Sequence, residues 1–290
     1  MTLLDAAILG LVEGITEFLP VSSTGHLIIA SHLLGLDGAQ DKAALDAFTI
    51  VLQGGTILAV AGIYWPRIVQ MLRGLMGKDA AGLRLLGLLV LAFLPAAVLG
   101  VLLSSWLEKH LFFPAPVIAA VALGGVFMLA LEQWRTGRFG PPRPAYAHRT
   151  LDDLTARQAL FIGFMQCIAM WPGVSRSLMG IAGGVIVGLK PRDAAEFAFL
   201  LGLPTLGGAT VFKLFKNLRG PADENMFHVF SAGAIAVGVG VAFISALLAV
   251  EWLIAFLRRH GLSIFGWYRL ALAAGLLLAA WQGWISIAPK

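Results

Sequence analysis

Charged side chains are scarce in this sequence: Asp, Glu, Lys and Arg together make up 13% of its 290 residues. In soluble domains the charged share is roughly a quarter, so the scarcity argues against that class. Hydrophobic residues make up 59% of the chain, and the mean hydropathy is +0.85. A soluble core of this length could not bury so much apolar surface. The composition therefore predicts an integral membrane protein.

Cysteine is nearly absent as well. The single Cys167 excludes an internal disulfide and a cysteine-rich metal site, and its apolar flanks are typical of a packing residue. The N-terminus has neither a basic n-region nor an A-x-A-like cleavage site, so no cleaved signal peptide is expected. The net charge of +5 would suggest a nucleic-acid partner in a soluble protein. Here the basic residues fall in short loops, which is a membrane topology signal, and no nucleic-acid partner is expected.

Six apolar runs are long enough to cross a membrane. They cover about 43–64, 84–104, 115–133, 192–214, 230–254 and 266–285. Two further stretches, 1–36 and 158–189, are apolar but interrupted, by Pro20 and by Pro172-Gly173. Such residues break helices. We therefore predict an all-α polytopic membrane protein with six full transmembrane helices and two broken re-entrant helical hairpins.

The chain divides into two halves of one membrane domain, 1–133 and 158–290, joined by a polar linker at 134–157. Each half has one broken hairpin followed by three spans, and GLVE at 10–13 resembles GFMQ at 163–166. Because three is an odd number of spans, the second half would be inverted relative to the first. In inverted repeats of this kind, discontinuous helices meet near the midplane and build the site.

Loop charges predict the orientation of the spans. One side of the predicted topology carries fourteen basic residues, namely Arg67, Arg73, Lys78, Arg84, Arg135, Arg138, Arg143, Arg149, Arg157, Lys190, Arg192, Arg258, Arg259 and Arg269. The other side carries six, namely Lys42, Lys109, Lys213, Lys216, Arg219 and Lys290. By the positive-inside rule the richer side is cytoplasmic, so both termini are expected outside.

Two carboxylates, Glu13 and Glu17, lie in the first broken stretch. Residues four apart share one face of a helix. Adjacent carboxylates in a low dielectric repel unless a proton or a cation lies between them. A divalent cation with oxygen ligands, Mg²⁺ or Ca²⁺, is the cofactor we expect there. The alternative is that the two side chains brace the hairpin and bind nothing.

Three hydroxyls and an imidazole follow the same break, at Ser22, Ser23, Thr24 and His26. Serine or threonine at a helix start is an ordinary N-cap, which is the structural alternative. His26 lies three residues beyond Ser23, however, and a serine with a nearby imidazole is the arrangement that activates a nucleophile. The cluster therefore favours a functional site.

The second broken stretch supplies Gly173, Ser175, Arg176 and Ser177. Gly173 allows a sharp turn, and a helix that begins after it presents free N–H groups to a phosphate. Arg176 adds a planar, bidentate phosphate donor, or else it forms a structural ion pair with one of the glutamates. Outside the hairpins, Gln53 either lines the site or packs between helices.

The sequence EGITEFLPVSSTGH at 13–26, together with PGVSRS at 172–177, resembles the bacterial undecaprenyl-diphosphate phosphatase family, the bacitracin-resistance type. The resemblance covers nearly the whole chain and includes EFAFLLGLPTLGGA at 196–209. It implies a polytopic enzyme of the bacterial plasma membrane, commonly a homodimer, with two re-entrant hairpins. The implied reaction removes the terminal phosphate of undecaprenyl diphosphate, a polyprenyl diphosphate lipid, which recycles the carrier for cell-wall synthesis and confers bacitracin resistance.

Matching positions imply roles for individual residues. The catalytic residues would be Glu13, Glu17, Ser23, His26 and Arg176. The residues around the phosphates would be Ser22, Thr24, Gly25, Gln53, Gly173, Ser175, Arg176 and Ser177. The family's second motif usually continues to a threonine, where this chain has Gly180, so a hydroxyl contact from that position is missing.

Two mechanistic hypotheses follow for the enzyme. Ser23, assisted by His26, would attack the terminal phosphorus, or water would attack with His26 or Glu17 as the base. In both, Arg176 holds the phosphates and a metal offsets the developing charge. The competing class is transport, in which the same repeat carries the lipid phosphate or another anion without hydrolysis. The acidic pair favours the enzyme, because an anion carrier has little use for carboxylates beside its substrate.

Overall fold

The computed structural model describes residues 1–36, 42–138, 149–219 and 225–284. Within these ranges the chain is helical, and the only β-type pairing is an isolated bridge between Arg149 and Leu189. The long helices are α3 (Lys42–Ile63), α5 (Ala80–Leu111), α6 (Pro114–Arg135), α9 (Pro191–Leu218), α11 (Ala232–Leu257) and α12 (Ser263–Trp281). Shorter helices form two hairpins, α1 (Leu3–Thr16) with α2 (Ser23–Leu33) and α7 (Ala156–Ile168) with α8 (Arg176–Ile186). The remaining elements are α4 (Trp65–Leu75), α10 (Met226–Val229) and the 3₁₀ turn η1 (Leu151–Asp153).

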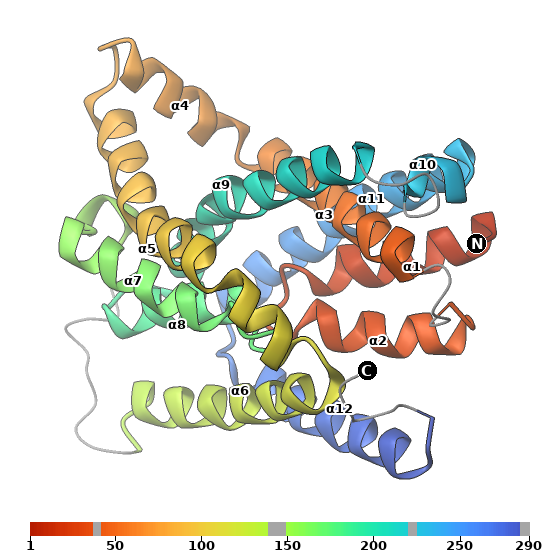
Figure 1. The fold of residues 1–290 in the computed structure, drawn as a ribbon. Coiled ribbons are helices and arrows are strands. Elements are labelled where there is room, and N and C mark those ends of the chain that lie inside the picture. The colour runs from red at the N-terminus through yellow and green to blue at the C-terminus, as the bar shows by residue number, and fades with distance from the viewer. Residues whose placement is uncertain (37–41, 139–148, 220–224, 285–290) are drawn as a thin grey trace.

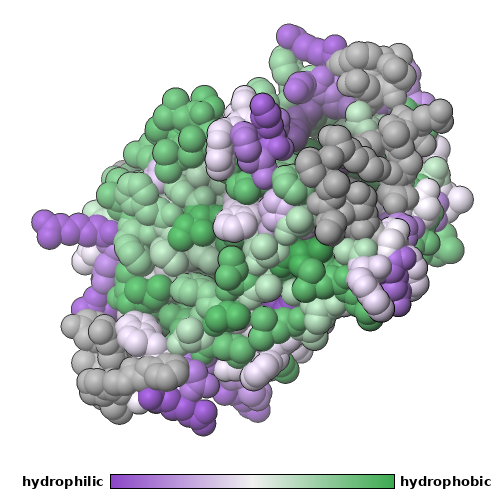
Figure 2. All heavy atoms as spheres, turned by 60° about the horizontal axis from the view of Figure 1, so that its bottom comes forward, coloured by the Kyte–Doolittle hydropathy of each residue, from purple (hydrophilic) through white to green (hydrophobic). Residues whose placement is uncertain are grey.

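The six long helices are each long and apolar enough to cross a membrane, which confirms the predicted spans. Their outward faces carry large exposed hydrophobic side chains, such as Leu102 on α5 and Val211 on α9. Figure 2 shows a broad hydrophobic area on one face of the molecule, with hydrophilic side chains gathered toward its two ends. Such a surface is stable in a lipid bilayer and not in water. The chain is thus a multi-pass membrane protein.

The hairpin helices are too short to span a bilayer. α1 has 14 residues and α8 has 11, which gives lengths of about 21 and 16 Å against a hydrocarbon core of about 30 Å. In Figure 1, α1/α2 and α7/α8 approach from opposite sides, and their turns meet in the middle of the molecule. How deep these turns lie in a bilayer stays a prediction.

The first hairpin turns just before the predicted interruption. Pro20 breaks the stretch 1–36, and α1 ends four residues before it, at Thr16. A proline ring clashes with the carbonyl group four residues earlier and offers it no N–H. For Pro20, that carbonyl group belongs to Thr16. Glu17 still caps α1 by donating its N–H to the Glu13 carbonyl oxygen at 2.9 Å, and residues 18–22 form the turn.

The segment 65–84, whose basic residues were counted as loop charges and which was therefore expected to be a loop, is largely helical. α4 begins with Pro66 in its first turn, where the missing N–H has no cost. It packs against the start of α5, where Gly74 and Gly82 let the two backbones approach closely. The loop prediction was wrong because this packing, and not local hydrophobicity, stabilises the short helix.

The first helix of each half packs against a helix of the other half. α1 packs along α11 of the second half, and α7 packs along α5 of the first half. Both contacts join backbones at a glycine: a Cβ on Gly10 would lie 2.3 Å from the Gly238 carbonyl oxygen, and one on Gly163 would lie 2.2 Å from that of Ala92. Gly10 and Gly163 are equivalent positions of the sequence repeat. This reciprocal packing is what an inverted repeat would produce, and the repeat itself remains a prediction.

Candidate active site

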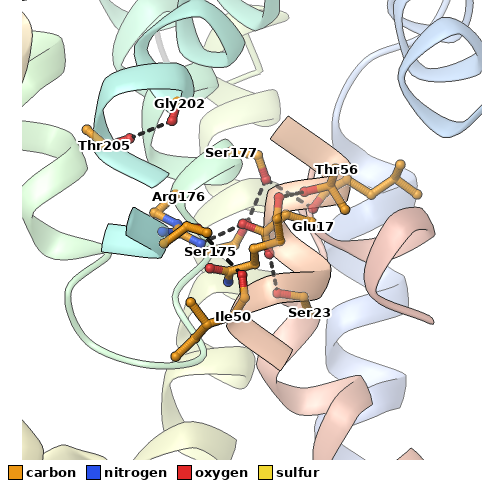
Figure 3. A network of polar contacts seen from close by, with 12 residues as sticks. Glu17, Ser23, Ile50, Thr56, Ser175, Arg176, Ser177, Gly202 and Thr205 are labelled. Atoms are coloured by element: carbon orange, nitrogen blue, oxygen red, sulfur yellow. Dashed lines mark hydrogen bonds and ion pairs between the residues drawn. The ribbon is translucent and has the colours of Figure 1, made fainter. Parts of the chain in front are cut away.

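An ion pair joins the two hairpin turns. Arg176 is the first residue of α8, and its Nη2 lies 2.5 Å from Oε1 of Glu17. The other carboxylate oxygen, Oε2, accepts a hydrogen bond from the Ser23 hydroxyl at 2.6 Å (Figure 3). The Glu17 side chain is only 3% exposed, so both of its oxygens are engaged away from solvent. The turns thereby bring predicted residues of both motifs into direct contact.

Each hairpin turns through a serine with left-handed backbone angles. Ser22 has a φ of 73° and Ser175 a φ of 80°, and each immediately precedes the second helix of its hairpin. Such angles are uncommon for residues other than glycine and cost roughly 1–3 kcal/mol. They let α2 and α8 begin where the turns meet, so the free N–H groups of both helices start there.

Serine hydroxyls add contacts between the turns. The Ser177 hydroxyl donates to the Leu19 carbonyl oxygen at 3.0 Å and lies 2.9 Å from the Ser175 hydroxyl. The Ser175 oxygen also accepts from the Leu178 N–H at 3.2 Å and so caps α8. The N-cap that the sequence analysis considered for the first hairpin is not formed by Ser22, whereas Ser175 of the second hairpin forms one.

Glu13 is fully buried, and neither of its carboxylate oxygens has a hydrogen-bond partner within the described ranges. The side chains of Glu17, Arg176 and Gln53 influence whether the Glu13 carboxyl group is ionised. Leaving a buried carboxylate unpartnered is costly, so Glu13 either keeps a proton or binds a cation. The part of the chain that the structure describes contains no group of three or more His, Cys, Asp or Glu side chains placed to hold a metal. A cation here would have two protein carboxylates and would take further oxygens from water or phosphate, as Mg²⁺ often does.

The imidazole of His26 is held at both nitrogens. Nδ1 lies 2.7 Å from the Ser22 carbonyl oxygen, and Nε2 lies 2.7 Å from the hydroxyl of Tyr268 on α12. The structure thus gives Ser23 a different partner from the predicted one, since its hydroxyl donates to Glu17. The sequence analysis missed Tyr268, because this contact spans 242 positions and no local pattern marks it.

The other predicted residues surround this centre. Thr24 is exposed on α2, and Gly25 is buried on the face of α2 that contacts α6 and α12. Gln53 is half-buried on α3, and no hydrogen bond to the Glu13 carboxylate is formed within the described ranges. A small pocket opens beside the ion pair, and its lining includes Glu17, Arg176, Ser177, Gln166, Phe199 and Thr205. Sequence analysis did not select Gln166, although the repeat pairs it with Glu13.

Arg269 connects α12 to α6 and to both hairpin turns. We counted it among the cytoplasmic loop charges, which was wrong, because it lies inside α12 and is fully buried. Its guanidinium donates to carbonyl oxygens of α6 and of both turns, namely Ala120 (3.0 Å), Val121 (3.2 Å), Pro20 (3.4 Å) and Gly173 (2.8 Å). Gly173 has a φ of 97°, which favours glycine. An arginine within the predicted span 266–285 was the signal that could have placed it.

Comparison of the sequence with known proteins identifies the family. The family model described as "Bacitracin resistance protein BacA" matches residues 6–275. The chain belongs to the BacA family. The "Undecaprenyl-diphosphatase" of Sorangium cellulosum is 46% identical over 275 residues, which cover 94% of this chain and 85% of that protein. The "Undecaprenyl-diphosphatase 2" of Rhodospirillum rubrum is 45% identical over 284 residues, which cover 98% and 97%.

The BacA match confirms the resemblance inferred from the two motifs. It also extends beyond them, because the matched range contains α12 up to residue 275 and hence both Tyr268 and Arg269. The residues that hold the turns therefore lie within the family region along with the motif residues.

Replacing Arg269 by lysine should destabilise this BacA-family fold. A lysine ammonium lacks the planar fork that reaches α6 and both turns at once, and each hydrogen bond to a charged group contributes about 1.5–3 kcal/mol. We expect the thermal unfolding midpoint of the purified protein in detergent to fall by about 5 °C or more. Arg258→Lys, at an exposed position after α11, should leave the midpoint unchanged. Equal midpoints for both variants would show that the turns do not depend on Arg269.

Proposed function

We propose that this chain is an undecaprenyl-diphosphatase, which hydrolyses undecaprenyl diphosphate to undecaprenyl phosphate and inorganic phosphate. The observation that carries the proposal is the Glu17–Arg176 pair, with a serine hydroxyl bound to the carboxylate, where two helix N-termini meet. This arrangement offers an arginine and free N–H groups to phosphate oxygens, and a hydroxyl to phosphorus. The BacA match and the relatives named for this activity support the same reaction.

A lipid diphosphate suits the position of the site. Its isoprenoid tail can stay in the apolar environment of the spans, while its charged head group requires polar partners. The pocket beside the ion pair provides both, with Arg176 and Ser177 alongside Phe199 and Leu206. In the cell, the reaction would return the carrier lipid to cell-wall synthesis and confer bacitracin resistance.

The contacts support Glu17 as the group that accepts the first proton. Its Oε2 already accepts the Ser23 hydrogen bond, so it can take that proton as Ser23 Oγ attacks the terminal phosphorus. The bond from that phosphorus to the bridging oxygen breaks, undecaprenyl phosphate leaves with the electron pair, and water then releases phosphate from the serine. In the water-attack alternative, Glu17 takes a proton from water, and Ser23 orients the carboxylate. Arg176 exchanges its contact with Glu17 for the phosphate oxygens in both versions.

The acidic pair is also the proposed cation site. Glu13 supplies a buried carboxylate without a hydrogen-bond partner among the described residues, and Glu17 lies one helical turn away. Oxygen ligands of this kind suit Mg²⁺ or Ca²⁺. A bound divalent cation would supply charge neutralisation for the diphosphate. Transport without hydrolysis gives no role to a serine held on a carboxylate, so hydrolysis is the better account of the site.

The orientation that we propose places both termini outside the bacterial plasma membrane. With Arg269 buried, thirteen basic residues remain on the predicted cytoplasmic side against six on the other. Of these, Arg143 in the linker and the C-terminal Lys290 lie outside the described residues. The positive-inside rule supports this orientation. A reporter fused to the C-terminus should score outside, and a cytoplasmic score would contradict the topology.

The exposed apolar faces of the spans require membrane lipids as partners. The family resemblance further implies a homodimer, which we include in the proposal. Light scattering of the protein in detergent should give the mass of two chains, and a single-chain mass at micromolar concentration would contradict the dimer.

Phosphate release from undecaprenyl diphosphate by the purified protein tests the proposed reaction. We expect Arg176→Lys and Glu17→Gln each to lower kcat/KM by about 100-fold or more. The first variant removes the guanidinium that binds the phosphates, and the second removes the carboxylate base. Ser23→Ala separates the two nucleophiles: a similar loss supports serine attack, and near-full turnover supports water attack. Ser104→Ala, at an exposed position of α5, is the matched control. Wild-type protein that moves the lipid in vesicles without releasing phosphate would contradict the hydrolase.

Removal of divalent cations tests the site at Glu13 and Glu17. A chelator should lower both phosphate release and the thermal unfolding midpoint, and Mg²⁺ or Ca²⁺ should restore them, with about 2.7 kcal/mol of stabilisation at a hundred times the Kd. The rise in midpoint should vanish in Glu13→Gln and persist in Glu251→Gln, an exposed glutamate on α11. If neither chelator nor cation changes the thermal unfolding midpoint, Glu13 keeps a proton and the proposal of a cation site is wrong.

A further inference from the structure

Tyr268 on α12 contacts the imidazole of His26 in the first hairpin. Its hydroxyl lies 2.7 Å from His26 Nε2, and the two rings are nearly parallel, with an interplanar angle of 4°. His26 Nδ1 lies 2.7 Å from the Ser22 carbonyl oxygen on its other side. A chain of two hydrogen bonds therefore runs from α12 through the imidazole to the strained residue that precedes Ser23.

We propose that Tyr268 is a positioning residue, which acts through His26 and Ser22 to hold the Ser23 hydroxyl on Glu17. The proposal rests on the phosphohydrolase function proposed above and names a residue that the motifs do not include.

The direction of the hydrogen bonds follows from the Ser22 carbonyl group. A carbonyl oxygen can only accept, so His26 Nδ1 must carry a proton. In the neutral ring, Nε2 then has a lone pair, and the Tyr268 hydroxyl donates to it. Without that donor, a neutral imidazole can move its proton to Nε2 and lose the bond to Ser22. Tyr268 thus favours the Nδ1-protonated tautomer, which donates a hydrogen bond to the Ser22 carbonyl oxygen.

The bond to Ser22 matters because of the backbone strain at that residue. With a φ of 73°, Ser22 persists in this conformation only where its surroundings hold it. Ser22 lacks the side-chain cap that Ser175 forms in the second hairpin. The His26 imidazole supplies the missing restraint through its hydrogen bond to the Ser22 carbonyl oxygen. Ser23 follows directly, and its hydroxyl reaches Glu17 only if the turn keeps this shape.

The structure also fixes Tyr268 itself. The next residue, Arg269, is buried and donates to the carbonyl oxygens of Pro20 and Gly173 in the two turns. Gly266 lies about one helical turn before Arg269, and a Cβ on it would lie 3.1 Å from the Gly125 carbonyl oxygen. α12 therefore lies directly against α6. The phenol is therefore presented from a helix that is anchored to the same turns.

Tyr268→Phe in the full-length protein tests the proposal, because it removes one hydroxyl and keeps the ring. Loss of one hydrogen bond of about 0.5–1.5 kcal/mol predicts a fall in kcat of about 2- to 13-fold, with KM for undecaprenyl diphosphate unchanged. In protein labelled with ¹⁵N-histidine, the His26 signals should also move toward the Nε2-protonated tautomer. Comparison with His26→Gln identifies them among the six histidines. Trp267 is 65% exposed on the same helix, and the control variant Trp267→Phe should change neither kcat nor the His26 signals.

A Tyr268→Phe variant with wild-type kcat, or with an unchanged His26 tautomer, would overturn the positioning role. A rise in KM with kcat unchanged would also overturn it, because the phenol would then bind substrate directly. If wild-type protein released no phosphate, the proposed function would fail, and the role of Tyr268 in that reaction with it. The ¹⁵N signals would still report whether the hydroxyl sets the tautomer, so the two failures are distinguishable.

Discussion

The fold depends on a buried guanidinium whose hydrogen-bond partners are backbone carbonyl groups. Arg269 is fully buried, and its described hydrogen bonds go to carbonyl oxygens of α6 and of both hairpin turns. Each component would be costly alone, since an unpaired charge and irregular backbone are both unfavourable in an apolar interior. Together they satisfy one another, because turns leave carbonyl groups unpaired and arginine carries five donors. The meeting of the two turns is therefore a requirement of packing before it is a requirement of chemistry.

The second constraint is the charge balance at the meeting point. The first hairpin contributes Glu13 and Glu17, whereas the second contributes Arg176 and has Gln166 at the position that the repeat pairs with Glu13. The ion pair of Glu17 with Arg176 neutralises one carboxylate and leaves the other, Glu13, without a described partner. A phosphate that takes over Arg176 would leave both carboxylates of the acidic pair without a cationic partner. A site of this composition gains most from a cation at the moment when substrate is bound, which ties the proposed cofactor to the proposed reaction.

Local signals in the sequence were sufficient for the spans and for the ion pair. Long apolar runs predict membrane helices, and a charged residue such as Arg176 inside an apolar stretch marks a site. The errors have a common physical cause. α4 forms because it packs on α5. His26 bonds to Ser22 and to a phenol from α12 instead of to the Ser23 hydroxyl. Arg269 is buried because two turns supply carbonyl groups. Each depends on contacts between distant segments, which apolar periodicity does not encode. The end of α1 differs, since the clash of Pro20 with the Thr16 carbonyl group was predictable from local geometry.

The two strained serines explain why α12 has such influence on residues so far away in the chain. Glycine would adopt the angles of Ser22 and Ser175 without strain, so serine at both positions indicates that the side chains or their surroundings are needed. Ser175 is held by its own cap on α8, and Ser22 by an imidazole that α12 orients. The second turn is thus restrained locally, whereas the first, which lies between the carboxylates and the nucleophile candidate Ser23, is restrained by a residue of another helix. The reactive geometry of the first hairpin is therefore complete only when the last long helix has packed against it.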